Sequence, residues 1–183
     1  MWPKLFLTGL LLFGAGTSIH AERTDYGTIR VDTTPTQNER ELIERADLIV
    51  LGWTDSAHQR YPTGLRVPSG SLFNFVQTIH VKQAMKGKPT HLLHLLTTGI
   101  EPLPDADDPL NLRYPGPLAE GDYVCFLRRV AGTTLYTIVG VWQGVYPIHQ
   151  GRTVAIEGAG YPSFDKLSPQ KMANKLKQLM KPR

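Results

Sequence analysis

Apolar and polar side chains alternate along the segment LFNFVQTIHVKQAMKG, which begins at Leu72. One face of this alternation is apolar and carries Phe73, Phe75, Ile79 and Val81. The opposite face is polar and carries Asn74, Thr78, His80 and Lys82. A two-residue period of this kind predicts a half-buried β-strand.

Short apolar runs predict the remaining strands, because they are rich in β-formers and too short for independent helices. They are DLIVLGW (47–53), THLLHLLTT (90–98), DYVCFLRRV (122–130), TTLYTIV (133–139), VYPIH (145–149) and TVAIE (153–157). The pairs Ala131-Gly132 and Gln150-Gly151 are suited to tight turns between them. Proline and glycine predict loops at 55–71 and 99–121.

A helix is predicted at each end of this series of strands. In TQNERELIERA (36–46), Thr36 is the expected N-cap, Glu39 completes a capping box, and the apolar side is formed by Leu42, Ile43 and Ala46. Near the C-terminus, Ser168 is the expected cap and Pro169 the first helical residue. Its apolar stripe consists of Met172, Leu176, Leu179 and Met180. We expect this helix to dock on the strands, with an anionic membrane as the alternative surface.

Together these elements predict a mainly β fold, a small antiparallel barrel or sandwich with a short N-terminal helix and a C-terminal amphipathic helix. Residues 36–183 form the expected single domain, preceded by an extended lead-in at 22–35. Residues 1–21 have one early positive charge, an apolar run and small residues toward Ala21, which is typical of a secretory signal peptide. We therefore expect export to the periplasm or beyond, and no membrane span after cleavage.

Four stretches between Ala46 and Glu157 follow one another in an order that is typical of a known group of proteins. ADLIVLGW opens the first strand, VKQAMKGKP ends the second, PLAEGDYVCFLRR enters a long buried strand, and LYTIVGVWQGVYPI follows. In this order the chain resembles secreted bacterial proteins with a netrin-like or tissue-inhibitor-of-metalloproteinase-like OB barrel. The resemblance implies that barrel and a protease-inhibitor-like role. The animal inhibitors use an N-terminal cysteine and disulfides that this sequence lacks, so no functional residue carries over.

The sequence has no motif for catalysis, metal or cofactor binding. Its glycines match neither a P-loop nor a dinucleotide fingerprint, and no serine lies in a nucleophile elbow. His91 and His94 would lie on opposite faces of a strand, and PDADDP (104–109) lacks the glycine and distal glutamate of a calcium loop. Cys125, the single cysteine, lies among apolar residues, which favours a buried structural side chain. No catalytic residue, metal ligand or cofactor is predicted.

The candidate binding residues are aromatic or basic. They are Trp142, Tyr146, Tyr161, Lys171 and Lys175, while Trp53 is expected in the core. The formal net charge is +4 and the pI about 9.2. Export and this small charge disfavour nucleic acid, so a protein or an anionic envelope component is the expected partner. The predicted function is that of an exported, non-catalytic binding module; a small secreted hydrolase and a structural envelope component are the alternatives.

Overall fold

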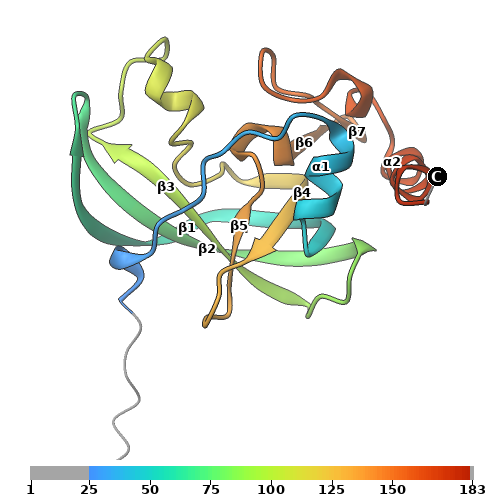
Figure 1. Ribbon diagram of the computed structural model, residues 1–183, viewed down its shortest axis with the longest axis horizontal. Helices are drawn as coiled ribbons and strands as arrows, with labels where there is room; N and C mark the ends of the chain where they lie inside the picture. The colour runs from blue at the N-terminus through green and yellow to red at the C-terminus, as the bar shows by residue number, and fades with distance from the viewer. Residues whose placement is uncertain (1–24, 182–183) are drawn as a thin grey trace, which may run out of the picture.

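The computed structural model describes residues 25–181 (Figure 1). The predicted signal peptide at 1–21 lies outside these residues. The strands are β1 (Leu48–Val67), β2 (Gly70–Lys86), β3 (Leu92–Glu101), β4 (Gly121–Arg129), β5 (Leu135–Ile138), β6 (Val145–His149) and β7 (Arg152–Thr153). The helices are α1 (Glu39–Arg45) and α2 (Pro169–Leu179), with 3-10 turns η1 (Tyr26–Thr28), η2 (Pro109–Leu112), η3 (Val141–Gly144) and η4 (Pro162–Phe164). The predicted mainly β class, with one helix before the strands and one after them, is confirmed.

The strands pair in the order β1-β2-β3-β5-β4-β6-β7, and β1 also pairs with β4. Strands β1, β2, β3, β5 and β4 therefore pair in a closed cycle, because β4 pairs with β1 again. β3 and β5 run parallel, whereas the other neighbours are antiparallel. This arrangement brings the two halves of the chain together, because β1 near the N-terminus lies directly beside β4.

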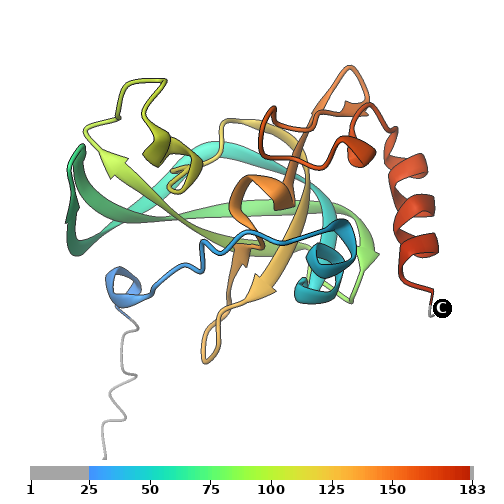
Figure 2. The same cartoon turned by 45° about the horizontal axis from the view of Figure 1, so that its top comes forward.

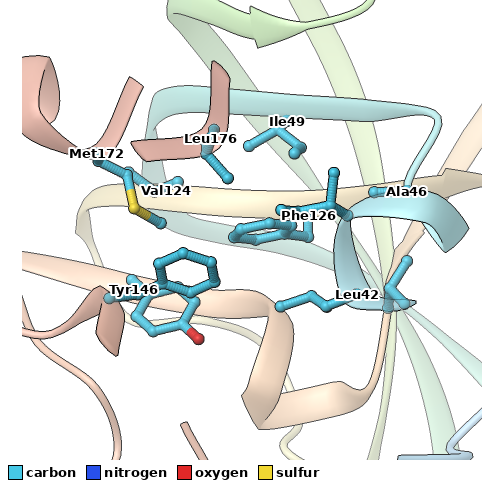
Figure 3. Packing of buried hydrophobic residues seen from close by; sticks show 11 residues of the cluster. Leu42, Ala46, Ile49, Val124, Phe126, Tyr146, Met172 and Leu176 are labelled. Atoms are coloured by element: carbon cyan, nitrogen blue, oxygen red, sulfur yellow. The ribbon is translucent and has the colours of Figure 1, made fainter. Parts of the chain in front are cut away.

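Both faces of β1 are largely buried over residues 48–54, and both faces of β4 are buried over residues 124–127, which explains the continuous apolar runs there. Val50 and Cys125 belong to an inner cluster with Ile79, Leu93 and Leu95. Outward-facing side chains belong to a second cluster that the helices and the C-terminal segment cover (Figure 3). This outer cluster consists of Leu42, Ile43, Ala46, Ile49, Val124, Phe126, Val139, Tyr146, Phe164, Met172 and Leu176. The apolar side predicted for the first helix is thus confirmed.

The polar loop predicted from Asp55 is wrong, because β1 continues to Val67 and forms a long hairpin with β2. Beyond Thr54, β1 pairs with β2 and no longer with β4. Pro62 in this stretch lies opposite Phe73. Since the strand has a neighbour on one side only, a residue without an N–H can be accommodated at its other edge.

Residues 25–36, the N-terminal strap, cross the sheet from the β1–β2 hairpin to α1 (Figures 1 and 2). Asn74 was predicted on an exposed polar face, but it is fully buried beneath this strap. Its Nδ2 donates 2.8 Å hydrogen bonds to the carbonyl oxygens of Tyr26 and Ile29. Its Oδ1 accepts a bond of 2.7 Å from Thr98 Oγ1. The side-chain amide therefore fastens one end of the strap to β2.

The other end of the strap is fastened by Gln143. The Gln143 side chain accepts from the backbone N–H of Thr36 and donates to its carbonyl oxygen, at 2.5 and 3.0 Å. Thr36 is therefore not the N-cap of α1 as predicted. Asn38 caps the helix by accepting from Glu41 N at 3.0 Å, and the Glu41 carboxylate accepts from Gln37 N. The capping interactions lie two residues later than predicted because Thr36 is used in the strap.

The C-terminal helix docks on the outer cluster as predicted (Figure 2). Ser168 caps it, and Met172 and Leu176 are fully buried against the strands. Leu179 is half-buried, and Met180 is 37% exposed. None of the helices within residues 25–181 has the length and apolar character that a membrane crossing requires.

The glycine-rich segment from Gly140 forms turns and short elements. Gly140 has φ of 66° before η3, and Gln150 and Gly151 have φ of 49° and 73° in the predicted turn. The strand predicted at 153–157 is wrong beyond Thr153. There, Ala155 N donates to the Asp165 carboxylate at 2.9 Å, so the chain is held by a side chain instead of a neighbouring strand.

Candidate functional site

Polar and aromatic side chains lie on the outer face of β1, β2 and β3, away from the inner cluster. The strand register places Trp53 opposite His80, and Thr78 opposite His94. The rings of Trp53 and His80 lie 5.4 Å apart at an angle of 53°. Intervening residues such as Ile79 and Leu93 point into the inner cluster. Period-two alternation in β2 therefore presents Thr78 and His80 outward, as predicted.

A bulge in β1 shapes the neighbouring part of this face. Thr54 pairs with Ile79 and His58 with Gln77, so residues 55–57 lie opposite Thr78 alone. The Asp55 carboxylate accepts from Ala57 N at 3.0 Å, and Gln77 Nε2 donates to the Asp55 carbonyl at 3.1 Å. Bulges re-aim side chains and occur often beside functional sites. Here the bulge turns a short polar stretch of β1 toward the outer face.

A hollow of about 380 Å³ lies between this bulge, the strap and the β4–β5 hairpin. Its lining combines polar and apolar surface and consists of Tyr26, Asp55, Ala57, His58, Gln59, Val76, Thr78, His94, Thr134 and Leu135. We call this hollow, together with the adjoining Trp53 and His80, the sheet-face site. Its lining includes a single carboxylate and neither lysine nor arginine.

The walls of the sheet-face site are held by buried hydrogen bonds. Gln77 is 1% exposed, and besides Asp55 it bonds both the N–H and the carbonyl of Leu118, at 2.7 and 2.9 Å. On the opposite wall, Tyr26 packs edge-on against Tyr61 at 5.1 Å and is carried by the strap that Asn74 fastens. The site therefore has fixed walls formed by segments far apart in the sequence.

A second hollow, the apolar groove, lies on the other side of His58. It measures about 740 Å³ and is lined mainly by apolar and proline side chains, including Phe73, Phe75, Ile100, Leu103, Tyr114 and Pro117. Gly99 and Gly116 form part of its lining and approach each other closely. Arg60 lies 4.7 Å from the Phe73 ring and pairs with Glu101, a lining residue.

The histidines near the two hollows lack the partners of a general base. His58 Nδ1 lies 3.0 Å from the carbonyl oxygen of Ser56. Across residues 25–181, no hydrogen bond joins a histidine to a carboxylate or to a serine hydroxyl, whereas a catalytic base is usually oriented by such a group. In the same residues, no group of three or more His, Cys, Asp or Glu side chains is placed to hold a metal ion.

The predicted aromatic binding surface is wrong for Tyr146, which is fully buried in the outer cluster. Burial raises the pKa of its hydroxyl, which accepts from Tyr161 N at 3.1 Å. Tyr161 bonds Thr36 through its own hydroxyl, and Trp142 Nε1 donates to the Asn111 carbonyl at 2.8 Å. All three aromatic side chains are therefore engaged within the protein: Tyr146 in the outer cluster, Tyr161 with the strap and Trp142 with the backbone of Asn111.

The two predicted lysines differ in their surroundings. Lys175 is half-buried, donates to the Ser163 carbonyl at 2.7 Å and lies 5.6 Å from the Phe164 ring. Lys171 is exposed on α2. Trp53, expected in the core, is only partly buried and belongs to the sheet-face site instead.

Cys125 lies in the inner cluster and is 1% exposed, as predicted for a structural side chain. Burial raises the pKa of its thiol to about 12. The thiolate that a nucleophilic cysteine needs is therefore strongly disfavoured at neutral pH.

Comparison with known proteins gave no match, either to family models, to curated proteins or to solved structures.

Proposed function

We propose that this chain is an exported, non-catalytic binding module built on a small OB-type barrel. Its ligand is an extracellular or envelope oligosaccharide chain, and the sheet-face site is the surface that holds it. The observation that carries the proposal is the row of partly or fully exposed aromatic and polar side chains on β1, β2 and β3, beside a hollow with fixed walls.

Strand pairing supports the barrel. The cycle from β1 through β2, β3, β5 and β4 back to β1, with β3 and β5 parallel, agrees with a five-stranded Greek-key barrel. The resemblance between residues 46 and 157 and secreted netrin-like proteins implies the same architecture. In OB folds, the face of strands 2 and 3 and the adjoining loops bind oligonucleotides and oligosaccharides. The sheet-face site draws Thr78 and His80 from β2 and His94 from β3, the strands that hold this position in the proposed barrel.

The side chains of the site favour sugar over nucleic acid. Trp53 offers an aromatic surface on which a sugar ring can stack, while Thr78 and Gln59 offer uncharged hydrogen-bonding groups. Nucleic-acid binding depends strongly on lysine and arginine contacts to phosphate. The hollow is lined by neither residue, and nearby Lys82 is paired with Asp122 at 2.6 Å. A neutral, hydroxyl-rich chain suits this surface better than a polyphosphate backbone.

Export is supported by the charge, the apolar run and the small residues of the predicted signal peptide. The lone cysteine is buried, so the described domain offers no exposed thiol to an oxidising compartment. An exported binder of this size would meet glycan chains of the envelope directly.

Calorimetric titration with soluble hexasaccharides of N-acetylglucosamine, glucose and mannose tests the proposal. We expect binding to at least one of them, and Trp53→Ala should weaken it at least tenfold because the stacking surface is removed. Tyr114→Ala, an aromatic truncation in the apolar groove, is the matched control and should leave affinity within twofold. Equal losses in both variants, or no binding across the series, would contradict the assignment.

A further inference from the structure

Helix α2 carries a set of positive charges that its own stability explains only in part, because Lys177 alone lies in the last turn, where a cation suits the helix dipole. Its exposed or half-buried lysines are Lys171, Lys175 and Lys177, and Lys181 follows the helix. The helix contains no acidic residue. Within residues 25–181, none of these lysines forms an ion pair. The pattern differs from α1, where acidic and basic side chains are mixed.

The positions of the lysines oppose helix stability at two points. Lys171 is three residues after the N-cap Ser168, where a glutamate would complete a capping box and favour the positive end of the helix dipole. Lys171 and Lys175, as well as Lys177 and Lys181, are like charges spaced by four residues, which repel each other on a helix. Residues that weaken local structure without a compensating structural gain are typical of functional surfaces.

The apolar side of α2 is already occupied. Met172 and Leu176 are fully buried in the outer cluster (Figure 3), and Ala173 is 6% exposed. A helix that lies on a membrane inserts its apolar face among the acyl chains. Because that face of α2 packs on the protein, only its polar side can contact a ligand.

We propose that the exposed side of α2 binds a linear phosphate-rich polyanion. This side alternates lysines with amides and consists of Gln170, Lys171, Asn174, Lys177, Gln178 and Lys181. Lysine binds phosphate as a compact point charge, and α2 has no arginine, the residue suited to bidentate recognition of a single carboxylate or phosphate group. At 1.5 Å per residue the lysines extend over about 15 Å, which suits a chain of successive phosphates along the helix.

This surface is separate from the sheet-face site. No residue of the sheet-face site belongs to α2, and in Figure 1 α2 lies at the end of the longest axis opposite the β1–β2 hairpin. The two proposals therefore predict independent ligands, and Trp53→Ala should leave polyanion binding unchanged.

Binding of inorganic polyphosphate in low salt, measured by fluorescence anisotropy, tests the inference. We expect wild-type protein to bind, with affinity falling steeply as salt rises, and K171Q/K177Q to bind at least tenfold more weakly. The matched control is R30Q/R66Q, which removes the same charge from exposed positions on the strap and the hairpin. It should weaken binding less than threefold. If both variants weakened binding equally, net charge alone would explain the effect and the inference would be overturned. Absence of binding by the wild-type protein would overturn it as well.

Two further measurements are needed. The first tests whether the lysines serve binding or stability, and the second tests whether their ligand is a polymer or a membrane. K171Q/K177Q should melt close to the wild-type temperature, because the repulsion that it removes within α2 offsets the lost interaction of Lys177 with the C-terminal end of the helix. A lower melting temperature would assign the lysines to stability. Vesicles of phosphatidylglycerol and phosphatidylcholine, matched in phosphate, should bind at least tenfold more weakly than polyphosphate. If the protein bound the vesicles more tightly than polyphosphate, and K171Q/K177Q lost this binding, the ligand would be a membrane and not a polymer.

Discussion

Replacing Asn74 by alanine should release the N-terminal strap from the sheet. The side chain is fully buried and makes three hydrogen bonds, to Tyr26 and Ile29 in the strap and with Thr98 in β3. Alanine leaves the two carbonyl oxygens and the Thr98 hydroxyl without this partner. Tyr26 also forms one wall of the sheet-face site, so the substitution affects the site as well as the fold.

The cost follows from these three bonds. Each contributes about 0.5–1.5 kcal/mol net, and a buried group left without a partner costs about 1–3 kcal/mol. Carbonyl oxygens in the strap can regain water if the strap lifts, which limits the total. We therefore expect the free energy of unfolding to fall by about 2–4 kcal/mol. For a domain of this size the melting temperature should fall by roughly 5–15 °C.

Thermal melts followed by circular dichroism give the change in stability, and hydrogen exchange at residues 25–36 shows whether the strap has lifted. Thr98→Val is the control, because it removes one of the three bonds and should cost about 1 kcal/mol. Exchange should rise in the strap of Asn74→Ala well beyond that in Thr98→Val. Unchanged melting and exchange in Asn74→Ala would refute the role of the amide as a clamp.

Three further substitutions test the packing. Leu176→Ala should lower the free energy of unfolding by about 2–5 kcal/mol, because it opens a cavity in the outer cluster; a chemical-denaturation change below 1 kcal/mol would contradict the docking of α2. Gly99→Ala should cost about 1–3 kcal/mol, since the new Cβ would lie 2.6 Å from the Gly116 Cα and 2.9 Å from the Phe75 ring; a melting temperature equal to wild type would refute that close approach. The Cys125 thiol has a raised pKa of about 12, so its contribution to stability is present below about pH 9 and is lost toward pH 12 at about 1.4 kcal/mol per pH unit. Cys125→Ala should remove this part of the alkaline decline in urea titrations, and rapid thiol labelling of native protein at pH 8 would contradict the burial.

The sequence pattern predicted strands best where one face of the strand is exposed to solvent or where the apolar run is unbroken. Alternation in β2 located that strand, and the apolar run around Cys125 located β4 because both of its faces are buried. The second half of β1 was missed because Pro62 and Gly64 are typical of loops. On an edge strand they interrupt few hydrogen bonds, and that position depends on β4 leaving β1 after Thr54.

The sheet-face site was visible only in fragments. Thr78 and His80 were recognised as an outward face, but their proximity to Trp53 and His94 follows from the strand register. Burial of Asn74 could not be read from its own segment, since its partners lie more than 40 residues earlier in the strap. The aromatic side chain of Tyr146 indicated a binding residue, yet α2 and the C-terminal segment cover it.

Binding at the sheet-face site is tested most directly by mapping amide chemical shifts during titration with the hexasaccharide that binds in calorimetry. We expect the largest shifts at Trp53, Thr78, His80 and His94, while the amides of the apolar groove and α2 should change little. Shifts concentrated around Leu103 and Tyr114, or along α2, would contradict it.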